Sequence, residues 1–142
     1  MKILGEKKNG IYWSYILVIL MALLMLFFGI KQEKVINGFI FMIMGIVFFI
    51  IGIYFIVDIT RYPQNIIVYN EIENTIILNN KVVISISTIK DVTFRNARSK
   101  SIVWKWGNVI IKTNGETYKC KYVKDCENVA KTLMKIMYNN EL

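Results

Sequence analysis

The chain of 142 residues contains no histidine, a single proline and only two cysteines. Without histidine it lacks the side chain that most often serves as a general base and as a metal ligand. Cys120 and Cys126 are too few for the disulfide framework of a small secreted domain, and they lack the CxxC spacing of a redox or metal motif. We expect two buried thiols that behave as small apolar side chains, with no metal and no cofactor.

Charge is scarce in the first part of the chain. Only seven charged side chains precede residue 58, and residues 58–142 hold the remaining 21. The net charge of +8 divides into +3 before residue 58 and +5 from residue 58 onward. A basic balance suits nucleic acid or an anionic membrane surface. Because the chain also has long apolar segments, the membrane is the simpler partner, and without a recognition helix or zinc ligands we expect no nucleic acid.

Two uncharged segments, residues 11–30 and 35–57, flank a short KQEK turn. Each is long enough for a helix to cross a hydrocarbon core of about 30 Å. A cleavable signal peptide is the alternative for the first segment, but its apolar region usually has only about 7–15 residues. The sequence therefore predicts a transmembrane hairpin in residues 1–62 and an aqueous domain in residues 63–142.

Small residues recur every seven positions in both segments, which places them on one face of each helix. Such residues let helices approach closely in lipid, although glycine is also simply common in membrane helices. In an antiparallel hairpin, Gly29 would face Gly38, Ala22 would face Gly45, and Tyr15 would face Gly52. The predicted helix-packing seam comprises Ala22, Gly29, Gly38, Gly45 and Gly52.

The distribution of lysine and arginine favours one orientation in the cell membrane. Lys2, Lys7 and Lys8 precede the first segment and the basic domain follows the second, while Lys31 and Lys34 lie in the turn. By the positive-inside rule we expect both termini in the cytoplasm, in a multi-pass arrangement.

Residues 63–142 alternate between short β-rich runs and turn sequences, and they end in an apolar stripe with helical spacing. This pattern predicts a small α+β domain with about seven antiparallel strands, in a bent sheet or barrel, capped by one C-terminal amphipathic helix. The expected strands are IIVY from Ile66, TIIL from Thr75, KVVISIS from Lys81, VTF from Val92, SIVWKW from Ser101, NVIIKT from Asn108 and TYKCKYV from Thr117. The expected helix carries Cys126, Val129, Ala130, Leu133, Ile136 and Met137 on one face.

The segments ISISTIKDVTF, WGNVIIKTNGETYKCKYV and DCENVAKTLMKIM, in this order, resemble the pleckstrin-homology-like (PH-like) superfold. With the apolar hairpin they resemble bacterial membrane proteins in which two transmembrane helices precede a PH-like domain. The resemblance implies an interaction module or a lipid-facing module. PH domains that bind phosphoinositides usually carry basic residues in the first hairpin loop. The corresponding stretch here, Asn70 to Asn74, is acidic through Glu71 and Glu73, which argues against that site.

One stretch, between Val92 and Gly115, has five cations and no acid. We expect its NARSK segment to form a loop, with Trp104 and Trp106 on the strand that follows. Cations and tryptophan both favour an anionic membrane interface. The alternative is a solvated hairpin whose tryptophans belong to the core. The candidate headgroup- or partner-contacting residues are Arg95, Arg98, Lys100, Lys105 and Trp104.

No nucleophile beside a base, no carboxylate pair and no phosphate-binding glycine loop stands out, so we expect no catalytic residues and no enzymatic activity. The leading hypothesis is a membrane-anchored PH-like interaction module at the cytoplasmic face, which binds a protein partner or anionic headgroups. The alternative is a small structural or accessory subunit of a larger membrane complex, recognised through its transmembrane hairpin.

Overall fold

The computed structural model describes residues 1–32 and 35–140 of the chain. Two compact units are present: Asn9–Arg61 form one, and Met1–Lys8 together with the chain from Tyr62 onward form the other. The first eight residues, which were expected to belong with the transmembrane hairpin, are part of the sheet domain. Glu33 and Lys34, which complete the expected KQEK turn, lie outside the described residues.

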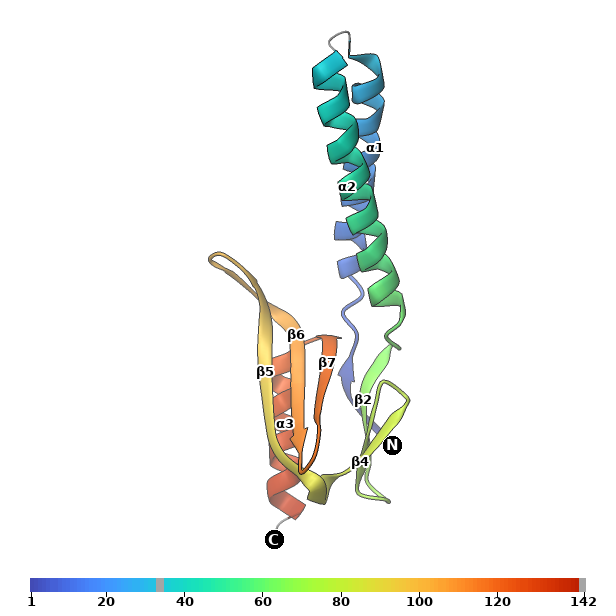
Figure 1. Ribbon diagram of the computed structural model, residues 1–142. Coiled ribbons are helices and arrows are strands. Elements are labelled where there is room, and N and C mark those ends of the chain that lie inside the picture. Colours follow the sequence, from blue (N-terminus) through green and yellow to red (C-terminus); the bar gives the residue numbers. More distant parts are fainter. Residues whose placement is uncertain (33–34, 141–142) are drawn as a thin grey trace. The chain divides into compact units, whose positions relative to one another are not determined.

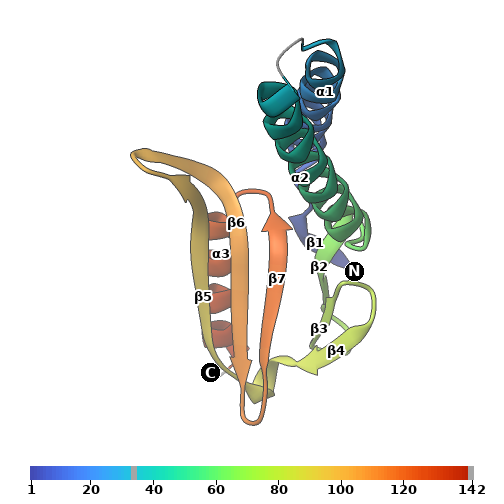
Figure 2. The same cartoon turned by 45° about the horizontal axis from the view of Figure 1, so that its top comes forward.

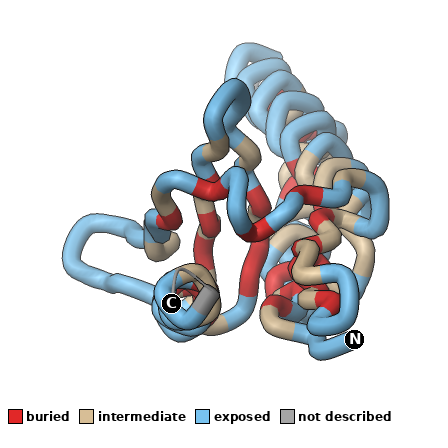
Figure 3. The backbone as a smooth tube through the Cα atoms, turned by 90° about the horizontal axis from the view of Figure 1, so that it is seen from below, coloured by how far each residue is buried: buried red, intermediate tan, exposed pale blue. Residues whose placement is uncertain are grey.

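The first unit consists of two helices, α1 (Ile11–Lys31) and α2 (Val35–Thr60), and both are long and apolar enough to cross a membrane. α2 continues three residues beyond the predicted end at Val57, because the last turn of a helix can carry a charge such as Asp58. Only 11% of the most apolar window of each helix is buried. The exposed outer surface of the helices is visible as pale blue tube in Figure 3.

In the second unit, seven antiparallel strands form two sheets within the described residues (Figure 1). The first sheet contains β1 (Lys2–Glu6), β2 (Asn65–Asn70), β3 (Thr75–Leu78) and β4 (Val82–Ser85), in that order. The second contains β5 (Ile89–Ser99), β6 (Ile102–Thr113) and β7 (Thr117–Val123), and a short 3-10 turn, Ile86–Thr88, links the sheets. The chain then forms α3 (Cys126–Asn140).

Strand β1 was not predicted. It pairs with β2, so the two apolar helices form the connection between neighbouring strands of one sheet. Beyond β1 the chain meets β7: Lys7 forms a bridge with Val123, and the Lys8 N–H donates to the Tyr122 carbonyl at 2.9 Å. The described strands form two sheets joined at this edge, and they do not close into the single bent sheet or barrel that the sequence suggested.

The position of β1 also changes the comparison with PH domains. Asn70 to Asn74 connects β2 to β3, so it is the second connection of the sheet and not the first. The first connection is the helical segment itself. Asn70 to Asn74 is therefore not the first connection of the sheet, with which the sequence analysis equated it.

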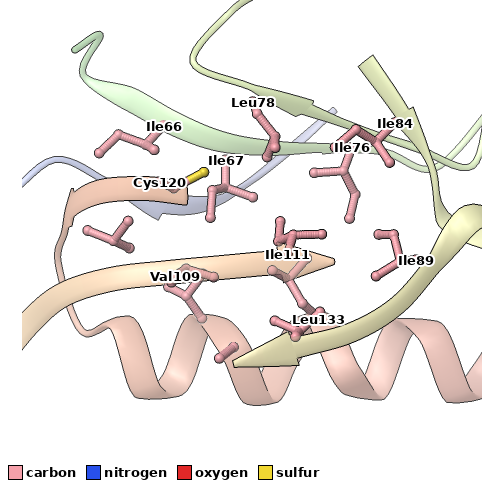
Figure 4. Packing of buried hydrophobic residues seen from close by; sticks show 14 of the residues in the cluster. Ile66, Ile67, Ile76, Leu78, Ile84, Ile89, Val109, Ile111, Cys120 and Leu133 are labelled. Atoms are coloured by element: carbon pink, nitrogen blue, oxygen red, sulfur yellow. The ribbon is translucent and has the colours of Figure 1, made fainter. Parts of the chain in front are cut away.

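The core lies between the two sheets and α3. Along β3 and the second half of β6, buried residues alternate with more exposed ones, as half-buried antiparallel strands require, whereas β2 buries the consecutive residues Ile66, Ile67 and Val68. Figure 4 shows Ile67 and Ile76 of the first sheet opposite Val109 and Ile111 of the second, with Leu133 of α3 beneath them. The helix that the sequence predicts thus covers the second sheet through the apolar stripe that the spacing indicated.

Candidate functional site

The most distinctive surface of the sheet domain is the far end of the β5–β6 hairpin. β6 pairs with β7 only from Gly107 to Lys112, so the part of the hairpin before Gly107 has no third strand beside it. We call residues 95–106, which comprise this part together with Arg95 at its base, the β5–β6 arm. Figure 2 shows it extending beyond β7 as a two-stranded projection. Two-stranded ribbons twist strongly and expose both faces to solvent.

The arm corrects two sequence predictions. SIVWKW and NVIIKT are not separate strands, because β6 runs without a break from Ile102 to Thr113. The NARSK segment is not a loop, because β5 extends to Ser99 and only Lys100 and Ser101 form the turn. The end of β5 consists of polar and charged residues. It lacks the apolar alternation that identifies a strand in sequence, because a ribbon exposed on both faces does not need it.

A bulge at the base bends the arm. Asn96 pairs with Gly107 and Arg98 pairs with Val103, so three residues of β6 lie opposite the single residue Ala97. Bulges of this kind bend a ribbon and increase its twist. Gly107 permits the close approach, since a Cβ atom there would lie 2.1 Å from the Arg95 carbonyl oxygen. Sequence analysis did not identify Gly107, and the WGN sequence was the only local signal.

Next to the Lys100–Ser101 turn, the tip of the arm carries exposed apolar residues. Ile102 is 58% exposed, Val103 is 62% exposed and Trp104 is 39% exposed. Among these, sequence analysis selected only Trp104. Ile102 and Val103 were read as ordinary strand residues, because a β-branched pair in sequence does not reveal whether a core covers it.

Four exposed cations lie along the arm, from its base to its turn: Arg95, Arg98, Lys100 and Lys105. None of them makes an ion pair within residues 1–32 and 35–140. Lys112, the fifth cation of the stretch, lies elsewhere on β6 and pairs with Asp91 at 3.3 Å. The structure thus brings the four predicted cations and Trp104 onto one projection and leaves the charge of the cations uncompensated by the described part of the chain.

A hollow of about 230 Å³ lies at the base of the arm, lined by Arg95, Asn96, Ala97, Arg98, Trp106, Gly107 and Asn108. The Cys126 thiol donates to Asn96 Oδ1 at 2.8 Å and fixes this amide from α3. Two arginines and two amides give the hollow several N–H donors and no carboxylate. This set of groups suits an anion with several oxygens.

An aromatic ladder connects the arm to the start of the first sheet. Ring centroids are separated by 6.3 Å between Trp104 and Trp106, by 6.5 Å between Trp106 and Tyr122, and by 5.5 Å between Tyr122 and Tyr62. The buried Lys7 donates from Nζ to the Tyr62 carbonyl at 2.7 Å. Both tryptophans lie outside the core cluster, which disagrees with the alternative that assigned them to the core.

The small residues of the predicted seam lie between α1 and α2. A Cβ atom on Gly38 would approach the Gly29 carbonyl oxygen to 2.7 Å, and one on Gly45 would approach the Ala22 carbonyl oxygen to 3.0 Å. Gly52 differs from the expected register: it lies against Ile19. Tyr15, its expected neighbour, stacks on Phe55 with centroids 4.9 Å apart.

The cysteines offer no reactive centre. Both are buried and neither forms a disulfide. Burial raises the pKa of the Cys120 thiol to about 12, and burial also raises the pKa of Cys126. Thiolate is the nucleophilic form of cysteine, so a thiol with a raised pKa is unreactive near neutral pH. Among the described residues no group of three cysteine, aspartate or glutamate side chains is placed to hold a metal.

Comparison with known proteins gives one family. Neither a curated protein nor a solved structure matches the chain. The family of unknown function DUF5381 matches residues 6–124, a range that contains both apolar helices, the complete β5–β6 arm and strand β7. Since this range covers most of the 142 residues, the chain belongs to the family DUF5381.

Proposed function

We propose that the chain is a non-enzymatic, membrane-anchored PH-like module that binds at the cytoplasmic membrane face through its β5–β6 arm. The arm itself carries this proposal. Its exposed apolar tip and four unpaired cations contribute little to the domain's own fold, since they lie outside the core cluster. Large exposed apolar residues gathered with uncompensated charge are typical of a binding surface.

The exposure of the two helices supports the anchor. At 1.5 Å per residue, helices of 21 and 26 residues are about 31 and 39 Å long, and a hydrocarbon core is about 30 Å thick. Leu, Ile and Phe side chains cover their outer surfaces and are exposed. Water cannot accommodate such a surface at low cost, whereas lipid can.

The order of elements supports the PH-like assignment. Seven antiparallel strands precede one C-terminal helix in the described residues, and this order agrees with the resemblance. The first strand-to-strand connection, which is the usual headgroup loop of PH domains, is occupied here by the membrane anchor. A binding surface elsewhere on the domain, such as the arm, agrees with that replacement.

The alternative, an accessory subunit recognised through its hairpin, receives less support. The glycines that would let a foreign helix approach closely are already in contact within the hairpin itself. Gly38 meets the backbone of Gly29, and Gly45 meets Leu26. The seam is thus used to close the hairpin, and we assign the recognition role to the sheet domain.

Single cysteines in the full-length protein test this proposal in native membranes. Gln32→Cys in the turn is expected to react with an impermeant maleimide in intact cells, and Val103→Cys only after the cytoplasmic face is opened. In inverted vesicles, Val103→Cys is expected to react several-fold more slowly than in detergent, because the occupied arm is shielded. Ile72→Cys, in a turn where residue 72 is 95% exposed, is expected to react at the same rate in both.

The native Cys120 and Cys126 are buried and do not compete for the reagent. Labelling of Gln32→Cys only from the cytoplasm would contradict the orientation. Equal rates at position 103 in vesicles and detergent would contradict the role of the arm.

A further inference from the structure

We propose that the β5–β6 arm docks on an anionic phospholipid surface, with the tip residues Ile102, Val103 and Trp104 at the level of the lipid interface. This inference rests on the proposed function and names the occupant of its binding surface. The four cations along the arm contact headgroup phosphates. The arm is then a second attachment to the same bilayer that the two helices cross.

The distribution of side chains along the arm supports a membrane interface as the partner. The apolar residues gather next to the Lys100–Ser101 turn, at the end farthest from the core. Lys100 lies in the turn itself, Arg98 pairs with Val103, and Arg95 lies at the base. Cations and exposed apolar side chains therefore share the outer end of the arm. A membrane interface accommodates both, because its phosphates attract cations and tryptophan prefers the boundary between headgroups and hydrocarbon.

The hollow at the base matches a headgroup phosphate. Arg95 and Arg98 line it together with the amides of Asn96 and Asn108. One guanidinium group can donate two parallel hydrogen bonds to two oxygens of a phosphate. This geometry strengthens the binding and fixes the orientation of the phosphate. The thiol of Cys126 donates to Asn96 Oδ1 and thereby keeps this amide in place before any ligand arrives.

Charge distinguishes an anionic lipid from a second copy of this chain. Two arms in contact would bring eight cations together, and none of the four on each arm is compensated within the described residues. An anionic leaflet attracts each of these cations. A protein with an acidic groove is negatively charged like the anionic leaflet, and the experiment below distinguishes this partner from lipid.

Short covalent connections favour the lipid over any soluble partner. Four residues, 7–10, join β1 to α1, and four residues, 61–64, join α2 to β2. Such segments span at most about 14 Å. A domain tethered so closely to a membrane-crossing segment meets the bilayer surface at a high effective concentration, so that even weak contacts are occupied.

The test uses the full-length protein in lipid nanodiscs, with an environment-sensitive fluorophore on Val103→Cys and nitroxide-labelled lipid as the quencher. In discs of equal parts phosphatidylcholine and phosphatidylglycerol, we expect quenching at position 103 several-fold above that at the control Ile72→Cys. In discs of phosphatidylcholine alone, we expect the quenching at 103 to fall toward the control. Added salt is expected to reduce it as well, because screening weakens the attraction.

Matched charge variants isolate the arm. Glutamine at positions 95, 98, 100 and 105 is expected to reduce quenching at 103 to the level of the Ile72→Cys control. Glutamine at Lys81, Lys90, Lys119 and Lys135, four exposed lysines outside the arm, removes the same charge and is expected to leave it unchanged. A single Ile102→Ser variant, which keeps every charge, is expected to lower it as well. Thermal unfolding of each variant verifies that the domain remains folded.

Each result decides between the proposals. Quenching that is equal at 103 and 72, or equal in both lipid compositions, overturns the docking on anionic lipid. If position 103 is unquenched in nanodiscs yet shielded from maleimide in native membranes, the occupant is a protein, and the proposed function survives without this inference. If position 103 is unquenched and also unshielded, both fail.

Discussion

Replacement of Gly107 by alanine tests the packing that bends the arm. A new Cβ atom would lie 2.1 Å from the Arg95 carbonyl oxygen, 2.9 Å from Asn96 Cα and 3.0 Å from Ala97 N. All three are backbone atoms, so the strand must move instead of a side chain. Overpacking costs about 1–3 kcal/mol, and the fixed backbone places this substitution near 3 kcal/mol. Since 1 kcal/mol shifts the Tm of a domain of this size by about 4–8 °C, we expect a decrease of about 12–24 °C.

Thermal unfolding of the full-length protein in detergent, followed by tryptophan fluorescence, measures this decrease. Gly115→Ala is the matched control, because nothing lies within 4 Å of its Cβ position. Neither glycine has a positive φ, so the two variants differ in the room available to the new methyl group and not in backbone strain. We expect the control to raise the free energy of unfolding by about 0.4–1 kcal/mol, because alanine reduces the conformational entropy of the unfolded chain. If Gly107→Ala unfolds at the temperature of the control, the bulge packing described above is wrong.

Three further results are expected. Deletion of Lys2–Glu6 removes strand β1 and is expected to abolish the cooperative unfolding transition of the sheet domain in urea; an unchanged midpoint would contradict its role in the sheet. Gly45→Val places side-chain atoms where a Cβ would already lie 2.8 Å from Leu26 Cγ, so it should weaken the packing of the two helices. Energy transfer between labels on the two helices should then be lost at a lower SDS concentration than in the parent. The exposed control Ile46→Val should behave as the parent. The pKa of Cys120 is raised to about 12 by burial, so the protonated thiol contributes stability that is complete below pH 9 and is lost as pH rises toward 12. Between pH 8 and 10.5 the parent should therefore lose about 2 kcal/mol more of its unfolding free energy than Cys120→Ala, and parallel pH profiles would refute this.

The long apolar helices could be predicted from sequence because their signal is local and strong. The predicted segments, residues 11–30 and 35–57, agree with α1 and α2 to within three residues at each end. The small-residue seam also follows from heptad spacing, because periodicity determines a helix face. The register at Gly52 does not follow from it, because the large side chains of Ile19 and Phe55 adjust the helix positions locally.

Strand β1 could not be predicted because its partner lies about sixty residues away. The segment KILGE is short and flanked by lysines, so it was interpreted as a charged flank of the first helix. Only pairing with β2 makes it a strand, and a single sequence does not reveal such a non-local contact. The count of about seven strands was nevertheless close, because the missed β1 offsets the predicted strand that is in fact part of β6.

The candidate site was predicted in part. A run of cations without an acid is visible in sequence, and so is a tryptophan beside it. The exposure of the apolar tip and the hollow at the base cannot be recognised in the sequence, since both depend on where β7 ends relative to β6. The need for glycine at position 107 can be recognised only from the structure, which places the Arg95 carbonyl oxygen next to it.

Extraction of native membranes with alkaline carbonate tests most directly whether α1 and α2 cross a bilayer. This treatment releases proteins held at the surface by charge and leaves proteins that span the lipid in the pellet. We expect the full-length protein to remain in the pellet at high pH and to become soluble only in detergent. Release of the protein into the supernatant by carbonate alone would contradict the anchor, and with it the proposed function and the docking of the arm.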